Sequence, residues 1–443
     1  MIDVPRQVAA LFFARSGGRP LSLKLAMNLV SNLQLHHCWH DMFCNLQALR
    51  IREFALVIPR ALSSHLLSSH DFDSAWIANT CMPSLEKLSI VALHHPDSLG
   101  RNADICLPSI LSNTLPSLRS LTLVGVWLPS TWGGYKGLTK LHVRLRGMLI
   151  LYPDILGVLR GSPNLEHIFI SIPFASQAHD SLKQTEGSIR LPRIKHVELE
   201  LVQRDMLFIL SAISFLDSLA FLRLQCKSRH LDSIQTFLPA DPRHLLDLNA
   251  LTAFTVDLSN NQLRICPGPE AVSTQETRTF ILESIGEPSL GSILSVASKA
   301  HELSTLRDEP FYAVYVRGCG SSSLDIECMT AILKRVPFKH TLGFSSCASE
   351  VVDGLREALG DLVLGKLEFY QMEISSEALL CLVLSHKTQI QHLSLLQCVL
   401  LAPSAEDARI VLKLLNKLLP GAAWYDVISY RNPDMDNSAR LPL

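Results

Sequence analysis

The stretch Leu115–Gly147, LPSLRSLTLVGVWLPSTWGGYKGLTKLHVRLRG, decides how the rest of the chain is interpreted. It contains one phrase twice, as Leu118-x-x-Leu121-x-Leu123 and as Leu138-x-x-Leu141-x-Val143. Within each copy the last two apolar residues alternate with polar ones, which is typical of a short strand with one buried face. The phrase therefore predicts a repeated strand.

Degraded copies of the phrase recur along nearly the whole chain. Their first positions are Pro20, Leu46, Leu85, Leu118, Leu138, Leu165, Ile194, Leu219, Leu251, Phe311, Lys339, Leu364 and Ile390. Most copies lie about 26 residues apart, inside the range of leucine-rich repeats. A single strand and helix cannot bury an apolar face alone, whereas stacked copies can. We therefore expect an α/β leucine-rich-repeat solenoid, with a parallel inner sheet and outer helices.

Helical patterns separate many of these strands, and Pro and Gly mark the junctions. The expected helices are Asp154–Arg160, Arg204–Leu216, Leu324–Arg335, Val351–Val363, Glu377–Ser385 and Ala408–Leu419. Three later copies also place a cysteine three residues after the last strand residue, at Cys319, Cys347 and Cys398. A small, weakly polar side chain suits a dry inward position, so these thiols are expected to be structural.

One segment departs from the repeat. Thr252–Leu258 and Gln262–Cys266 alternate around Ser259-Asn-Asn261 and predict a β-hairpin. Thr277–Ser284 is a candidate strand and Ser289–Ala300 a candidate helix. The expected organisation is a helical lead-in (1–17), leucine-rich repeats (18–256), a small β-rich insertion with a helix (257–310), further repeats (311–430) and a frayed tail (431–443).

Composition limits the class of protein. Of 443 residues, 48% are hydrophobic and 18% charged, so a large folded core is expected. A formal net charge of -1 offers no general attraction to nucleic acid or to an anionic membrane. The eleven cysteines form no CxxC pair, and no apolar run is long enough to cross a bilayer. A cytoplasmic or nuclear protein is expected.

The N-terminal phrase Arg15-Ser-Gly-Gly-Arg-Pro-Leu-Ser-Leu23, followed by many LPSLxxLxL units, resembles the F-box-like leucine-rich-repeat proteins of mushroom-forming fungi. The resemblance implies a substrate-binding receptor of a cullin-type ubiquitin ligase, whose F-box binds a Skp-type adaptor. No LPxE-like helical segment precedes Pro5, so the F-box itself is expected to be absent. A stand-alone repeat scaffold without a ligase link is the alternative.

The residues that flank the buried strand positions are expected on the concave face, where solenoids usually bind partners. Basic, acidic and aromatic side chains in neighbouring copies suit a mixed protein surface. The candidate protein-binding residues are Lys140, His142, Arg144, Phe169, Glu198, Glu200, Arg223, Tyr315, Arg317, Glu368 and Tyr370.

No catalytic, cofactor or metal residue is expected. His36-His-Cys-Trp-His-Asp41 is dense in ligand types, but adjacent residues on a helix point in different directions and cannot easily share one zinc ion. Gly318-Cys-Gly320-Ser-Ser-Ser323 echoes a dinucleotide fingerprint without its third glycine. GxSxG, HExxH and cysteine-histidine nucleophile patterns are absent from the sequence. We therefore predict a protein that is not an enzyme and binds a protein target.

Overall fold

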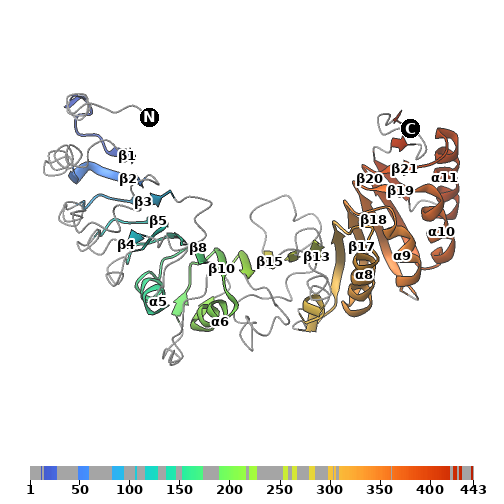
Figure 1. Ribbon diagram of the computed structural model, residues 1–443, viewed down its shortest axis with the longest axis horizontal. Helices are drawn as coiled ribbons and strands as arrows, with labels where there is room; N and C mark the ends of the chain where they lie inside the picture. The colour runs from blue at the N-terminus through green and yellow to red at the C-terminus, as the bar shows by residue number, and fades with distance from the viewer. Residues whose placement is uncertain are drawn as a thin grey trace. The chain divides into compact units, whose positions relative to one another are not determined.

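The computed structural model shows an α/β protein that divides into two compact units, residues 1–219 and 220–443. Figure 1 presents the elements in chain order. The structure describes residues 11, 14–26, 48–58, 82–93, 105–106, 115–127, 136–145, 152–172, 189–215, 219–226, 253–257, 262–266, 279–284, 298–302, 304–305, 309–360, 362–419, 423–426, 429–431 and 441–442.

The first unit is built on parallel strands that follow one another in chain order. They are β1 (Leu21–Ala26), β2 (Ile51–Ile58), β3 (Lys87–Ala92), β5 (Ser120–Val124), β7 (Lys140–Arg144), β8 (His167–Ile172) and β10 (His196–Leu201). Every neighbouring pair in this series is parallel. Parallel neighbours need crossover connections, so the chain crosses back to the same end of the sheet before each new strand begins.

Shorter elements lie in the connections of this unit. The helices are η1 (Ala48–Arg50), α5 (Tyr152–Gly161) and α6 (Gln203–Ala212). Two small parallel sheets join β4 (Ile105–Cys106) to β6 (Val126–Trp127), and β9 (Ile189–Leu191) to β11 (Ile213–Phe215). The sequence does not predict these four short strands, because a segment of two or three residues is too short to show alternation.

The repeated apolar positions are aligned across the sheet. Leu121 of β5 pairs with Leu141 of β7, which pairs with Ile168 of β8, and Ile168 pairs with Val197 of β10. All four are at most 3% exposed. Burying one such side chain contributes about 1.5–3 kcal/mol to the stability of the fold. The alignment allows each side chain to pack against the equivalent side chains of the neighbouring strands.

The second unit also carries a mainly parallel sheet. Its strand order is β12 (Phe221–Cys226), β15 (Thr279–Ser284), β14 (Gln262–Cys266), β13 (Ala253–Asp257), β16 (Phe311–Arg317), β17 (Phe338–Ser345), β18 (Leu364–Tyr370), β20 (Ile390–Leu396) and β22 (Ala423–Asp426). The predicted hairpin is present, since β13 and β14 pair antiparallel. β14 is also antiparallel to β15, whereas β15 is parallel to β12 and β13 is parallel to β16.

Helices cover one side of this sheet beyond β16, as Figure 1 shows for α8 to α10 beside β17 and β18. The helices are α8 (Ser323–Arg335), α9 (Val351–Ala358), α10 (Ser376–His386) and α11 (Ala405–Leu418). Ser322, Ser375 and Ser404 cap α8, α10 and α11, because each serine oxygen accepts a hydrogen bond from the backbone N–H three residues later. A further small sheet contains β19 (Glu373–Ser375), β21 (Val399–Leu401), β23 (Ser429–Arg431) and β24 (Leu441–Pro442).

A repeated turn follows the long strands of the second unit. Gly318, Ser346, Gln371 and Gln397 all have positive φ, between 50° and 64°. The residue after each is buried, and these four inward residues are Cys319, Cys347, Met372 and Cys398. The left-handed residue turns the chain so that its successor points inward, which produces the predicted inward position. Gly125 and the buried Val126 repeat this turn in the first unit.

The buried thiols donate to backbone carbonyls near the ends of the strands. Cys347 Sγ lies 3.3 Å from the Ser345 oxygen, and Cys398 Sγ lies 3.3 Å from the Phe369 oxygen. The Cys319 backbone N–H donates to Cys347 Sγ at 3.4 Å. Burial raises the pKa of the Cys319 and Cys398 thiols, so both stay protonated at neutral pH. The predicted structural role of these cysteines is consistent with this geometry.

The structure corrects the position of two predicted repeat copies. The second copy was placed at Leu46, with Leu49 and Ile51, but the buried series is Ile51, Phe54 and Leu56, and Leu49 is 46% exposed. Phe54 pairs with Leu88 of the next strand, which fixes this choice. In the first copy Pro20 is exposed, and its neighbour Leu21 is buried opposite Ile51 across a register shift.

Three segment boundaries are also corrected. The helix predicted to reach Leu216 ends at Ala212, because β-branched Ile213 begins β11 beside β9. The helix predicted to reach Val363 ends at Ala358, and Gly360 with φ of 47° breaks its continuation. The tail predicted to fray contains β24, which pairs antiparallel with β23. Most of the predicted lead-in helix and of helix 289–300 lies outside the described residues.

The repeated turn leads to a prediction about stability. Ser346→Gly should raise the free energy of unfolding by a few tenths to about 1 kcal/mol, because a non-glycine residue is strained at positive φ. Gly318→Ala should lower it by about 1 kcal/mol for the same reason. The exposed Ser321, which lacks positive φ, supplies the control Ser321→Gly. Urea unfolding measures all three, and a stabilising Ser321→Gly would contradict the explanation.

Candidate functional site

The side chains that alternate with the buried ones form what we call the open face of each sheet. In the first unit, β7, β8 and β10 align these side chains in three rows across the strands. The rows are Lys140–His167–His196, His142–Phe169–Glu198 and Arg144–Ser171–Glu200. The register therefore gathers six of the eleven predicted binding residues into one surface.

Aromatic contacts occupy the middle of this surface. The rings of His142 and Phe169 stack with centroids 4.3 Å apart and an angle of 19° between their planes. In the row beside them, the His167 and His196 rings are 5.8 Å apart and tilted by 37°. Phe169 is only partly buried, so its ring offers an apolar surface at the centre of the open face.

The acidic side of the surface lies on β10. His196 Nε2 is 2.6 Å from Glu198 Oε1, and the Ser171 hydroxyl donates to Glu200 Oε2 at 2.5 Å. The first contact lies within β10, whereas the second joins the Glu200 carboxylate to β8. The face thus changes from basic on β7, through aromatic on β8, to acidic on β10.

Two histidines of this surface favour the neutral state. Burial lowers the pKa of His142, and the positive charge of Arg144 lowers it further, whereas Glu198 opposes the shift. Burial also lowers the pKa of His167, with Lys140 and His196 acting in the same direction. At neutral pH the fixed positive charge on β7 therefore comes from Lys140 and Arg144.

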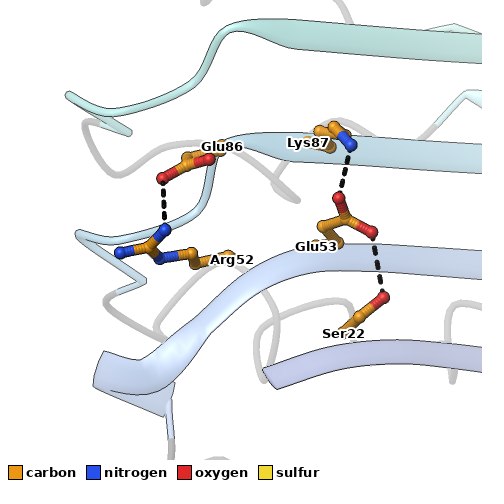
Figure 2. A network of polar contacts seen from close by, with 5 residues as sticks. All are labelled: Ser22, Arg52, Glu53, Glu86 and Lys87. Carbon is orange, nitrogen blue, oxygen red and sulfur yellow. Dashed lines mark hydrogen bonds and ion pairs between the residues drawn. The ribbon is translucent and has the colours of Figure 1, made fainter. Parts of the chain in front are cut away.

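Towards the N-terminus, the open face pairs its charges across the strands. Figure 2 shows Glu53 of β2 between Lys87 of β3, with which it forms an ion pair, and Ser22 of β1, whose hydroxyl donates to Glu53 at 3.0 Å. The Lys87 ammonium and the Ser22 hydroxyl lower the pKa of Glu53, and Glu53 in turn raises the pKa of Lys87. These groups lie in water, so the pair sets orientation more than stability.

A second group of predicted residues lies on the open face of the other unit. Tyr315, Gly343 and Glu368 form one row, and Arg317, Ser345 and Tyr370 form the next. The Tyr315 ring lies across Gly343, so closely that a side chain on residue 343 would place its Cβ inside the ring's van der Waals surface. Glu368 forms an ion pair with Lys366 on its own strand at 3.1 Å. Tyr370 is 37% exposed.

Within the second unit, Arg223 lies apart from the strand that carries Tyr315. Arg223 lies on β12 beside Ile281 of β15, and three strands separate β12 from the Tyr315 strand. Sequence reasoning also missed Tyr312 and His340, whose rings stack at 4.7 Å with 9° between planes. The His340 ring in turn lies over Gly365. A register shift near Phe311 brings this pair together, and the phrase gave no signal of it.

The structure gives no support to a nucleotide site at the predicted dinucleotide-like loop. At the predicted dinucleotide-like loop, Ser322 and Asp325 bond to each other at the start of α8, so a carboxylate occupies the position that a phosphate would need. Within the described residues, no group of three metal-ligand side chains gathers. The cluster at 36–41 lies outside the described residues.

Comparison with known proteins gives no assignment. No family model matches the chain, and no curated protein matches it. Among the described residues, no helix is both long and apolar enough to cross a membrane.

The neutral histidines predict a pH dependence of stability. A pKa that is lowered by folding means that the unfolded chain binds the proton more tightly. Stability is then complete above the unfolded value of about 6.5 and falls as the pH drops through it. We expect the loss between about pH 7.5 and about pH 5.5 to be smaller in the double variant His142→Gln/His167→Gln than in the unchanged protein.

The control for this measurement is His392→Gln, because His392 is exposed on β20. It should retain the pH slope of the unchanged protein in urea unfolding. Equal slopes in all three proteins would show that His142 and His167 do not couple folding to protonation.

Contact between Tyr315 and Gly343 gives a second expectation. Gly343→Ala should destabilise the protein by about 1–3 kcal/mol, because its Cβ would overlap the Tyr315 ring. In a Tyr315→Ser background the same change should be almost neutral, since the ring is gone. A double-mutant cycle of unfolding free energies measures the coupling, and additive effects would contradict the proposed overlap.

Proposed function

We propose that this protein is a leucine-rich-repeat solenoid that recognises a protein through the open face of its strands. The repeated register carries the proposal: it assigns the aligned apolar positions of neighbouring strands to the core and leaves the alternating positions to vary. These alternating residues differ from strand to strand, from Ser120 and Thr122 on β5 to His196 and Glu198 on β10. A constant core beneath a variable face is the arrangement with which repeat proteins bind partners.

The character of the face favours a protein as the partner. Cationic, aromatic and anionic side chains lie within three neighbouring strands, which suits the mixed chemistry of a protein surface. A nucleic acid would require a more uniformly positive surface, and Glu198 and Glu200 would repel its phosphates.

The link to ubiquitin ligases rests on the resemblance of Arg15–Leu23 to the F-box-like group. In this protein the phrase forms a turn at the start of the first sheet, where Gly17 has φ of 56°. The Arg50 guanidinium donates to the Arg19 oxygen at 2.7 Å and to Ser16 Oγ at 2.9 Å. The phrase therefore anchors β1 to the segment before β2. We propose that the solenoid presents a target for ubiquitination; a stand-alone scaffold is the alternative.

Site-directed photo-crosslinking in fungal cells tests the proposal. A benzoylphenylalanine placed at Thr122, on the open face of β5, should capture a discrete protein, whereas the same group at Arg160, on the exposed surface of α5, should not. Equal capture at both positions would contradict recognition by the open face.

The same cells separate the two forms of the proposal. Recovery of a Skp-type adaptor with the protein, and ubiquitin on the captured target, would support the ligase receptor. A target captured at Thr122 without adaptor or ubiquitin would instead support the stand-alone scaffold.

A further inference from the structure

Strand β7 carries two cations that lack the ion pairs formed by several other lysines of the protein. Lys87 pairs with Glu53 across β2 and β3, and Lys195 pairs with Glu166 at 3.2 Å. Lys366 likewise pairs with Glu368. Lys140 and Arg144 are exposed, and neither forms an ion pair with any residue that the structure describes. The strand thus presents two cationic side chains that no described carboxylate pairs with.

The neighbours of β7 offer no carboxylate on the open face. Across β5 the aligned residues are Ser120, Thr122 and Val124. Across β8 they are His167, Phe169 and Ser171. Glu166, which directly precedes β8, pairs with Lys195, and Glu198 and Glu200 lie two strands away on β10. We call Lys140, His142 and Arg144 the β7 stripe.

The distance between the two cations of the β7 stripe favours an extended ligand. Side chains on one face of a strand recur every second residue, at about 6.6–6.8 Å, so Lys140 and Arg144 are about 13 Å apart. An extended peptide laid along β7 repeats its own side chains with the same period. Two acidic residues four positions apart would then meet both cations, and the residue between them would meet His142 and the Phe169 ring stacked on it.

We propose that the β7 stripe binds an extended acidic segment of a partner protein, with acidic side chains on alternate positions. This proposal deepens the protein-recognition function and rests on it. The carboxylates of β10 form the limit of the site on one side. They would repel a broad polyanion, whereas a single narrow acidic chain can lie along β7 without reaching them. The β8 aromatic ring supplies the apolar contact that a bare charge patch lacks.

Purified full-length protein and short peptides test this proposal directly. A fluorescent nine-residue peptide of alternating Glu and Thr should bind, whereas the matched Gln–Thr and Lys–Thr peptides should not. Lys140→Gln/Arg144→Gln should weaken binding about tenfold, which corresponds to about 1.4 kcal/mol for the loss of two exposed ion pairs. Raising the ionic strength from about 0.05 to about 0.5 M should also weaken it.

A matched control removes the same charge elsewhere in the unit. Lys136→Gln/Arg160→Gln alters an exposed turn residue and an exposed residue of α5, and should leave peptide binding unchanged. Circular dichroism establishes that both double variants are folded. Equal loss in the two double variants would overturn the proposal, because net charge alone would then account for binding. So would a single-stranded DNA of equal charge that binds as tightly as the Glu–Thr peptide.

His142 provides a readout that a general charge effect would not move. It faces Lys140 and Arg144 on its own strand, Thr122 on β5, Phe169 on β8 and, beyond them, Glu198 on β10. A bound carboxylate would favour its protonated form, so binding of the Glu–Thr peptide should tighten as the pH falls from about 7.5 to about 6. His142→Gln should abolish that dependence, and its persistence would contradict the assignment.

The two proposals can fail separately. No binding of the Glu–Thr peptide, together with capture of a target at Thr122, would refute the acidic segment and retain recognition by the open face. Peptide binding that depends on Lys140 and Arg144, without any target at Thr122, would retain the site and refute the broader recognition face.

Discussion

Parallel pairing with aligned apolar positions is the constraint on which this structure depends. A strand such as β7 has five residues, and its buried Leu141 and Val143 cannot be covered by that strand alone. They are covered because Leu121 and Leu123 stand beside them on one side and Ile168 and Ile170 on the other. A shift of one residue would move every one of these side chains to water. Function inherits this constraint, because the register that aligns the core also aligns the open face.

The turn after each strand solves a different problem. Backbone carbonyls near the end of a strand are costly when they are buried without a hydrogen-bond donor. The left-handed residue places a small or flexible side chain inward, where Cys347 donates to the Ser345 carbonyl and Cys398 to the Phe369 carbonyl. Thiols suit this position because they fill apolar space while bonding weakly. Met372 occupies the same position without a donor and relies on packing alone.

Alternation and spacing predicted the strands and helices well, because both report burial directly. The phrase failed where two registers were equally apolar: Leu46, Leu49 and Ile51 fit it as well as Ile51, Phe54 and Leu56, and only pairing with β3 distinguishes them. Segments of two or three residues, such as β11, carry too little pattern to predict. For the site, sequence placed residues on a face but could not tell which strands are neighbours, so Arg223 was grouped with Tyr315, from which three strands separate it. The stacking of Tyr312 on His340 depends on a register shift that no spacing reveals.

The antiparallel strand β14 has a consequence for how the second unit is made. β12 leaves the ribosome well before β15, yet β15 is the strand that pairs with it, and β13 and β14 are synthesised between them. The chain therefore cannot add its repeats one after another here. During synthesis the edge of β12 facing β15 stays open until residues 279–284 emerge, and only then can β12 join the strands β15, β14 and β13. Repeat assembly, elsewhere local, becomes at this one place a long-range event that is slower and more exposed to mispairing.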